Sequence, residues 1–219
     1  MKKQKIFIAC DTTSIRKIKK IIKETQNSKV NFGYKFGLEF LNSKHGRKFL
    51  ANLKNKITFG DYKLADIPNT CSSAIKAVKD LKLNYLSIHI SSGLKAIKEA
   101  KKVSGKTKLI GVTVLTSLDN KSLKQIGHTK KVKQLVLKQA ALIKKAGCDG
   151  IVCSAQEALV VRKRYKNLLI ITPGIRLPGD SSNDQMRIMT PKQAFKNKVS
   201  GIVIGRSLTK GNIKNNTKK

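Results

Sequence analysis

Short apolar segments alternate with amphipathic segments along almost the whole chain. The apolar segments are rich in β-branched residues and nearly continuous in hydrophobic character, which is typical of strands buried on both faces of a sheet. Eight such segments predict strands, at 6–11, 30–37, 57–63, 85–90, 108–115, 150–154, 168–174 and 201–206. The sheet that they form should be parallel and covered on both faces, because little of it is patterned for contact with water.

The segments between the strands predict helices. The clearest is 132–146, where apolar residues recur at helical spacing and Gly147 follows as a stop signal. Thr190-Pro191 has the pattern of an N-cap followed by proline at the first helical position. Further amphipathic stripes lie at 14–25, 71–82 and 93–103.

Eight strands, each followed by a helix, predict an α/β protein with the TIM (β/α)8 barrel fold in a single domain. We expect the barrel to span residues 1–206 and a short terminal helix with a basic tail to span 207–219. An open doubly wound sheet is the alternative, but no G-x-G-x-x-G motif follows the first strand.

The chain is strongly basic, with 47 Lys and Arg against 12 Asp and Glu and a net charge of +35. This charge makes a nucleic-acid-binding module an alternative to an enzyme. However, lysines are spread over every predicted helix, Trp is absent, and only seven of the basic residues are Arg, which is better suited to bidentate phosphate and base contacts. We therefore interpret the charge as a surface filled with Lys and expect no specific nucleic-acid partner.

Cysteine and apolar patterns indicate the compartment. The four cysteines form no C-x-x-C pair and no zinc-binding spacing with His, so we expect small buried side chains in a reducing environment. The longest apolar runs, of about five residues, are too short for a transmembrane helix. The apolar stretch near the start ends at Asp11, too early for a secretory signal. These features predict a cytoplasmic protein without a membrane partner.

Functional side chains of a TIM barrel lie at the C-terminal ends of its strands. The polar residues predicted there, together with those just beyond, are therefore candidates for ligand binding or acid–base chemistry, except His89, to which we assign no role. They are Asp11, Lys35, Asp61, Lys63, Asp66, Thr116, Ser117, Arg176, Gly205 and Arg206.

The cluster around Lys63 is the most informative. Asp61 and Lys63 are two residues apart on a predicted strand, so their side chains should point to the same face. Asp66 adds a carboxylate three residues later, and Lys35 lies on the neighbouring strand. A lysine flanked by anions is held in its charged form, which suits it to donate a proton and to stabilise a developing carbanion. A salt-bridged strand end without a catalytic role is the alternative.

A second candidate site follows the last two strands, where barrels often bind phosphate. Glycines in Thr172–Arg176 and Ile204–Ser207 allow close backbone approach, and Arg176 and Arg206 add forked donors. The polar stretch 177–187 is long enough for a closing lid. An ordinary turn with surface arginines is the alternative.

Several of these segments resemble orotidine 5′-phosphate decarboxylases over nearly the full length of the chain. The most specific are DYKLADIPNT at 61–70, TPGIRLPGD with DQMR within 172–187, and VIGR at 203–206. LTS at 115–117, DGIVCSAQEA at 149–158 and YKFGLEF at 34–40 are also similar to that family. Ala65 departs from the His that the family often has at this position, and it is not one of the charged residues.

The resemblance implies a carboxy-lyase that converts orotidine 5′-monophosphate to UMP in de novo pyrimidine biosynthesis, with no cofactor and no metal ion. Lys63 is implied to protonate C6 of the pyrimidine and to stabilise the carbanion there, within a catalytic network of Lys35, Asp61 and Asp66. A homodimer with shared active sites is implied, because Asp66, Ile67 and Thr70 would reach the partner's site. The implied substrate-binding residues are Asp11, Lys35, Asp61, Ile67, Thr70, Thr116, Arg176, Gln185, Gly205 and Arg206.

The nearest alternative is a 3-keto-sugar-phosphate decarboxylase or hexulose-phosphate synthase of the same barrel superfamily. Those relatives share the D-x-K-x-x-D pattern and normally use a metal ion with the acidic pair. Gln185 in the expected lid and the run Asp66–Thr70 favour the nucleotide enzyme.

Overall fold

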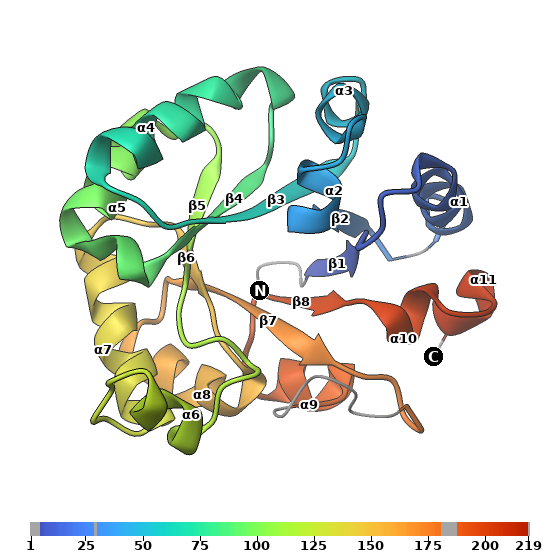
Figure 1. Cartoon of the computed structure of the whole chain (residues 1–219). Coiled ribbons are helices and arrows are strands. Elements are labelled where there is room, and N and C mark those ends of the chain that lie inside the picture. The colour runs from blue at the N-terminus through green and yellow to red at the C-terminus, as the bar shows by residue number, and fades with distance from the viewer. Residues whose placement is uncertain (1–4, 29, 181–187, 219) are drawn as a thin grey trace.

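The computed structural model describes residues 5–28, 30–180 and 188–218 (Figure 1). Within these residues, eight parallel strands close into a barrel in the order of the sequence, which confirms the TIM barrel and all eight predicted strands. The strands are β1 (Lys5–Ala9), β2 (Phe32–Phe36), β3 (Ile57–Leu64), β4 (Tyr85–His89), β5 (Lys108–Val112), β6 (Gly150–Val152), β7 (Leu169–Ile175) and β8 (Gly201–Ile204).

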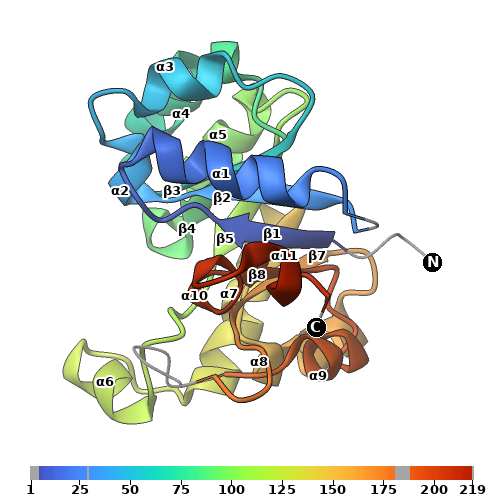
Figure 2. The same ribbon diagram turned by 90° about the vertical axis from the view of Figure 1, so that its right-hand side faces the viewer.

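Helices surround the barrel, as Figures 1 and 2 show from two sides. The predicted stripes at 14–25, 93–103 and 132–146 are confirmed as helices, whereas 71–82 divides into a helix and a 3-10 turn. The helices and 3-10 turns are α1 (Ile15–Thr25), α2 (Leu38–Leu41), α3 (Gly46–Ala51), α4 (Pro68–Ala77), η1 (Lys79–Leu81), η2 (Ile90–Ser92), α5 (Gly93–Val103), α6 (Asn120–Gln125), α7 (Val132–Lys145), α8 (Ala155–Arg164), α9 (Pro191–Lys196), α10 (Arg206–Thr209) and α11 (Ile213–Asn216).

Local sequence signals explain where two of these helices begin. The Ser14 hydroxyl caps α1 by accepting a hydrogen bond from the backbone N–H of Lys17. At α9, Thr190 and Gln193 form a capping box, and Pro191 occupies the first turn. The N-cap predicted at Thr190 is therefore confirmed.

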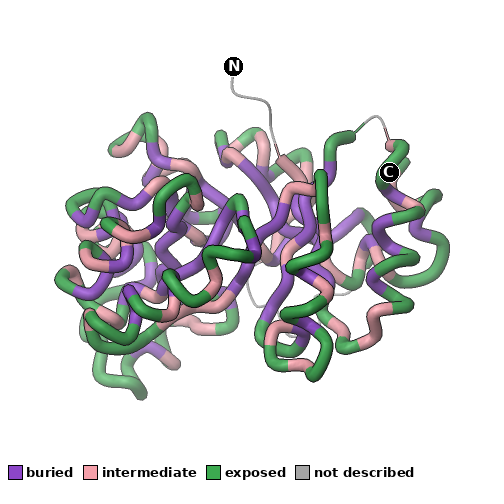
Figure 3. The backbone as a smooth tube through the Cα atoms, turned by 90° about the horizontal axis from the view of Figure 1, so that it is seen from above, coloured by how far each residue is buried: buried purple, intermediate pink, exposed green. Residues whose placement is uncertain are grey.

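The core has two parts, and Figure 3 shows buried residues gathered along the central strands with exposed residues over the helices. Between strands and helices, aliphatic side chains such as Ile8, Leu86 and Ile202 are fully buried. Inside the barrel, Phe7 packs edge-to-face with Phe59 and Tyr85, at centroid distances of 5.6 and 5.2 Å. This aromatic layer (Phe7, Phe59 and Tyr85) fills the barrel interior below the C-terminal ends of the strands.

The chain ends on the outside of the barrel. Helix α10 packs against β1, and α11 packs against α1 through the buried Ile213 (Figure 2). None of the helices in the described ranges is long and apolar enough to cross a membrane. All four cysteines are buried, as expected, and burial raises the pKa of Cys10 and of Cys148 to about 12.

Candidate active site

A cavity of about 530 Å³ opens at the C-terminal ends of the strands. Its wall combines apolar side chains such as Phe59, Val112 and Val203 with charged and polar groups. The structure thus brings nine of the candidate residues together from six different strand ends. They are Asp11, Lys35, Asp61, Lys63, Thr116, Ser117, Arg176, Gly205 and Arg206.

Asp61 lies at the centre of an ionic cluster in this cavity. Its Oδ2 atom lies 2.7 Å from the Lys63 ammonium and 3.4 Å from the Lys35 ammonium. The Lys35 ammonium in turn lies 3.1 Å from Oδ1 of Asp11. The four residues therefore alternate in charge along the cavity wall, which is the arrangement expected at the ends of β1, β2 and β3.

The cluster keeps its charges despite burial. Burial by itself would raise the pKa of Asp61, but the ammonium groups of Lys35 and Lys63 and a hydrogen bond from Ser87 hold this pKa below its ordinary value. Burial by itself would lower the pKa of Lys35, but the carboxylates of Asp61 and Asp11 hold it above its ordinary value. The Asp61 carboxylate and the Lys35 ammonium are therefore both ionised at neutral pH.

An irregularity of β3 places Lys63. Gly60 pairs with Leu86 and Leu64 pairs with Ile88, so three residues of β3 lie opposite the single Ser87 of β4. Lys63 has a φ of +48°, a left-handed conformation that costs an L-residue about 1–2 kcal/mol. The expected common orientation of Asp61 and Lys63 is thus present, but strand alternation is not its cause, because the bulge redirects the chain between them.

Ser87 is a site residue that the sequence pattern did not indicate. Its hydroxyl lies 2.8 Å from the backbone nitrogen of Lys63 and 2.8 Å from Oδ1 of Asp61. The available signal was a single hydroxyl inside the apolar segment 85–90, which is weak because the sequence alone does not show which groups the hydroxyl contacts. His89 lies two residues further, and burial followed by the charge of Lys63 lowers its pKa.

The second candidate site, predicted to bind phosphate, begins within strand β7 and not in an ordinary turn. Strand β7 continues through Thr172–Ile175, with a register shift over these residues and a φ of +74° at Gly174. The strand predicted at 168–174 is therefore confirmed, and the chain bends through Pro173-Gly174 before it pairs with β8 again at Ile175. Arg176 follows directly, is 8% exposed, and lines the cavity near Gly205 and Arg206.

Three other candidates lie away from this cavity. Asp66 is exposed, and its Oδ1 accepts a hydrogen bond from the backbone N–H of Ile67 at 2.7 Å. Ile67 is 66% exposed, and Thr70 is exposed on α4. Gln185 lies outside the described residues. In the part of the chain that the structure describes, no group of three His, Cys, Asp or Glu side chains could hold a metal ion.

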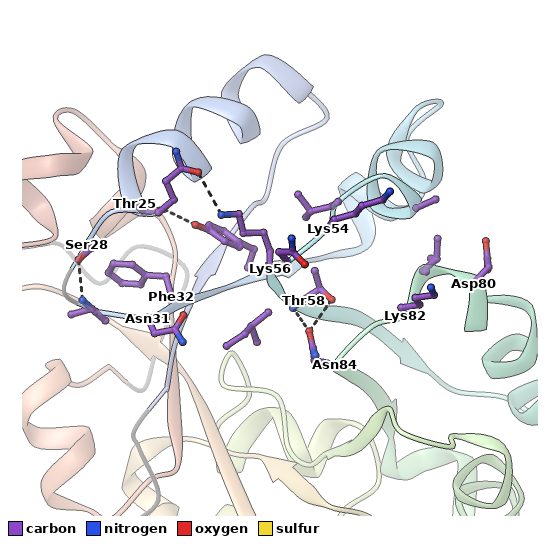
Figure 4. A pocket seen from close by; sticks show the side chains of 18 residues that line it. Thr25, Ser28, Asn31, Phe32, Lys54, Lys56, Thr58, Asp80, Lys82 and Asn84 are labelled. Carbon is purple, nitrogen blue, oxygen red and sulfur yellow. Dashed lines mark hydrogen bonds between the residues drawn. The ribbon is translucent and has the colours of Figure 1, made fainter.

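A larger cavity, of about 940 Å³, lies at the other end of the barrel (Figure 4). It is formed by the loops that precede β2, β3 and β4, and its wall includes Lys54, Lys56 and Lys82. Structural hydrogen bonds use its polar groups, such as Thr58 with Asn84 at 2.8 Å. This end of a TIM barrel supports stability and the C-terminal end supports catalysis. We therefore assign the active site to the smaller cavity.

The chain is similar to known enzymes over nearly its full length. Residues 4–217 match the family model OMPdecase, described as the orotidine 5′-phosphate decarboxylase / HUMPS family. An orotidine 5′-phosphate decarboxylase of Wolbachia sp. subsp. Brugia malayi (strain TRS) is 46% identical over 183 residues, which cover 81% of this chain and 80% of the relative. An orotidine 5′-phosphate decarboxylase of Prochlorococcus marinus (strain MIT 9215) is 41% identical over 219 residues. The matched region covers 94% of this chain and 89% of the relative. The crystal structure of the enzyme from Lactobacillus acidophilus superposes with a TM-score of 0.84 at 28% identity, covering 99% of this chain and 96% of that one.

Proposed function

The chain belongs to the orotidine 5′-phosphate decarboxylase / HUMPS family, and on that premise we propose that it decarboxylates orotidine 5′-monophosphate to UMP in pyrimidine biosynthesis. The observation that carries this proposal is the alternating cluster Asp11–Lys35–Asp61–Lys63 in one cavity with two arginines. In this cavity, the lysine ammonium groups can stabilise the anion that develops on the substrate, and the two arginines can bind its phosphate.

The chemistry requires a cation next to the reacting carbon. Breaking the bond between C6 and the carboxylate releases CO₂ and leaves the electron pair on C6, in an orbital that no neighbouring carbonyl can delocalise. The Lys63 ammonium, held 2.7 Å from Asp61, stabilises this pair and then donates a proton to C6, which yields UMP. Lys63 recovers its proton from solvent, so the reaction needs no cofactor.

The other residues of the cavity orient the substrate. Asp61 faces the leaving carboxylate and keeps the Lys63 ammonium in place, while Asp11 and Lys35 hold the ribose. Thr116 lines the same cavity and contributes to the substrate site. The phosphate is held by Arg176, Gly205 and Arg206, and we assign Gln185 to the same group by resemblance. Binding energy from this distant phosphate can be used to assemble the site around C6.

We also propose a homodimer whose two active sites each take residues from both chains. Asp66, Ile67 and Thr70 support this, because they project from the barrel rim instead of into their own cavity. Ile67 is 66% exposed, and contact with a second copy would remove this apolar surface from water. Asp66 then completes the partner's network as its second carboxylate.

The metal-dependent sugar-phosphate alternative is less well supported by the position of Asp61. Its Oδ2 already faces two ammonium groups, and its Oδ1 accepts a hydrogen bond from Ser87. A divalent cation at this carboxylate would meet both positive charges. We further propose a cytoplasmic location, which the four buried thiols support, and no specific nucleic-acid partner.

The proposal is tested by following the ultraviolet absorbance of orotidine 5′-monophosphate with the purified protein. The expected result is conversion to UMP with release of one CO₂ per nucleotide, and loss of conversion in Lys63→Ala. Stable absorbance with the folded parent protein would overturn the proposal. Turnover of a 3-keto-sugar phosphate instead would support the alternative.

A further inference from the structure

Ser87 connects two residues of the ionic cluster through one hydroxyl group. It lies on β4 inside the barrel, is 0% exposed, and belongs to the strand that faces the β3 bulge. Its Oγ atom is 2.8 Å from the backbone nitrogen of Lys63 and 2.8 Å from Oδ1 of Asp61. Both contacts are within the range of good hydrogen bonds.

The directions of these two hydrogen bonds are fixed by chemistry. The Lys63 backbone N–H can only donate, so the Ser87 oxygen accepts from it. The Asp61 carboxylate is ionised and can only accept, so the Ser87 proton goes to Asp61. The hydroxyl is therefore oriented by both partners and has no second proton to offer to another group.

Each bond constrains one member of the pair. The bond to Lys63 holds the backbone of a residue with a φ of +48°, a conformation that needs support from its surroundings. The bond to Asp61 holds Oδ1, which leaves Oδ2 directed at the ammonium groups of Lys35 and Lys63. Without Ser87, the carboxylate could rotate and the bulge could relax.

We infer that Ser87 is a positioning residue that sets the Asp61–Lys63 pair in its reactive geometry. It acts through these two residues and does not itself touch the reacting carbon. The kinetic part of this inference rests on the proposed decarboxylation, whereas the effect of Ser87 on the Asp61 carboxylate does not.

The first experiment compares Ser87→Ala, Ser87→Thr and Ser87→Val with the parent in steady-state turnover. Ser87→Ala should lower kcat by about 10- to 100-fold, the scale of a small misplacement of a catalytic group, with KM changed less than about threefold. Ser87→Thr keeps the hydroxyl and should recover most of kcat, whereas Ser87→Val has a similar volume and should not. Equal kcat values for the Thr and Val variants, or kcat of Ser87→Ala within twofold of the parent, would overturn the inference.

Thr113→Val is the matched control. Thr113 is 0% exposed, follows the neighbouring strand β5, and donates its hydroxyl to the backbone oxygen of Val152 at 2.7 Å. Thr113→Val likewise removes a buried hydroxyl and one hydrogen bond, but this hydroxyl bonds neither Asp61 nor Lys63. It should therefore leave kcat close to that of the parent, and a kcat loss as large as that of Ser87→Val would assign the Ser87 effect to general packing.

A second readout does not depend on catalysis. The charged groups that face Asp61 are Lys35 from β2 and Lys63 from β3, with Asp11 beyond Lys35 and His89 near Lys63. The Ser87 hydrogen bond is one of the interactions that lower the pKa of Asp61. Its removal should raise that pKa, measured by carbon-13 NMR of the carboxyl groups in Ser87→Val relative to Ser87→Thr.

The two readouts separate the possible failures. If the parent does not decarboxylate the nucleotide, the proposed function fails, and the NMR titration still decides the role of Ser87. If the parent is active and the pKa of Asp61 is the same in Ser87→Val and Ser87→Thr, the positioning role fails alone. If the bulkier Ser87→Thr and Ser87→Val variants do not fold, Ser87→Ala compared with the parent still supplies both measurements.

Discussion

Lys35 and Lys63 approach the same oxygen of Asp61 from neighbouring strands, at 3.4 and 2.7 Å. Two ammonium groups so close to one atom repel each other, and only an ionised carboxylate between them makes the arrangement stable. Because Asp61 is 8% exposed, water replaces little of this interaction. The carboxylate of Asp61 therefore determines how the cavity responds to pH.

Stability should depend on Asp61 in a pH-dependent manner. Its pKa is lower in the folded state than in the unfolded chain, so its contribution is present above the unfolded value, about 3.9, and is lost as pH falls through the folded value. Asp61→Asn leaves buried cations without their partner and should cost about 3–5 kcal/mol at pH 7. Urea unfolding should show that Asp61→Asn lowers the free energy of unfolding less at pH 2.5 than at pH 7. An equal loss at both pH values would contradict a lowered pKa of Asp61 in the folded state.

Lys35 should limit stability at the alkaline end. Its pKa is raised in the folded state, mainly by Asp61 and Asp11 against the effect of burial. Its contribution is thus complete below the unfolded value, about 10.4, and is lost as pH rises through the folded value. Lys35→Met should therefore lower the urea midpoint at pH 8 more than at the highest pH at which the parent remains folded. A midpoint difference that does not change with pH would argue against a charged Lys35.

Lys63→Ala should abolish turnover, because it removes the proposed proton donor and the cation nearest C6. We expect a loss of at least about four orders of magnitude in kcat, from the combined loss of acid catalysis and electrostatic stabilisation. Circular dichroism and the melting temperature serve as controls for folding. A folded variant within tenfold of the parent would assign the proton to another group.

Arg206→Ala should affect the nucleotide and the nucleoside differently. Loss of a charge-assisted contact to phosphate should weaken transition-state binding of orotidine 5′-monophosphate by roughly 1.5–3 kcal/mol in kcat/KM. Orotidine, which lacks the phosphate, should be a poor substrate and nearly insensitive to the change. Arg164→Ala, at the exposed end of α8, removes the same charge and should alter neither. Equal losses on both substrates would indicate a structural role for Arg206.

Asp66 should act in the neighbouring subunit. Lys63→Ala and Asp66→Ala are each expected to be inactive, but a mixed dimer carries both defects in one site and leaves the other site intact. With free exchange at equal concentrations, activity should rise to about one quarter of the parent value. Exchange is verified with a size tag on one variant, and no gain in activity despite proven exchange would place Asp66 in its own chain's site.

Turnover should be unaffected by a strong chelator. The two oxygens of Asp61 already face Ser87, Lys35 and Lys63, so the proposed reaction does not use a metal ion at this carboxylate. Activity is measured on orotidine 5′-monophosphate with and without prior chelation. Loss of activity that returns on addition of Mg²⁺ would favour the sugar-phosphate branch of the family.

The sequence was sufficient to predict the barrel, because each strand is a compact apolar run and the helices have clear stripes and caps. The sequence was also sufficient to predict that Asp11, Lys35, Asp61 and Lys63 lie close together, since the ends of parallel strands meet at one edge of the barrel. The bulge at Lys63 could not be predicted, because it depends on the register between β3 and β4. Ser87 was missed for the same reason: its partners are more than twenty residues away in the chain.

The aromatic layer inside the barrel also determines the path of the reactants. Phe7, Phe59 and Tyr85 are almost fully buried and touch one another below the ionic cluster. With the interior packed in this way, CO₂ and UMP return to solvent through the opening by which the substrate entered. The opposite rim, where Lys5 and Lys108 lie over the Tyr85 ring, is separated from that traffic. Substitutions of the side chains at that rim therefore leave the passage of substrate and product open.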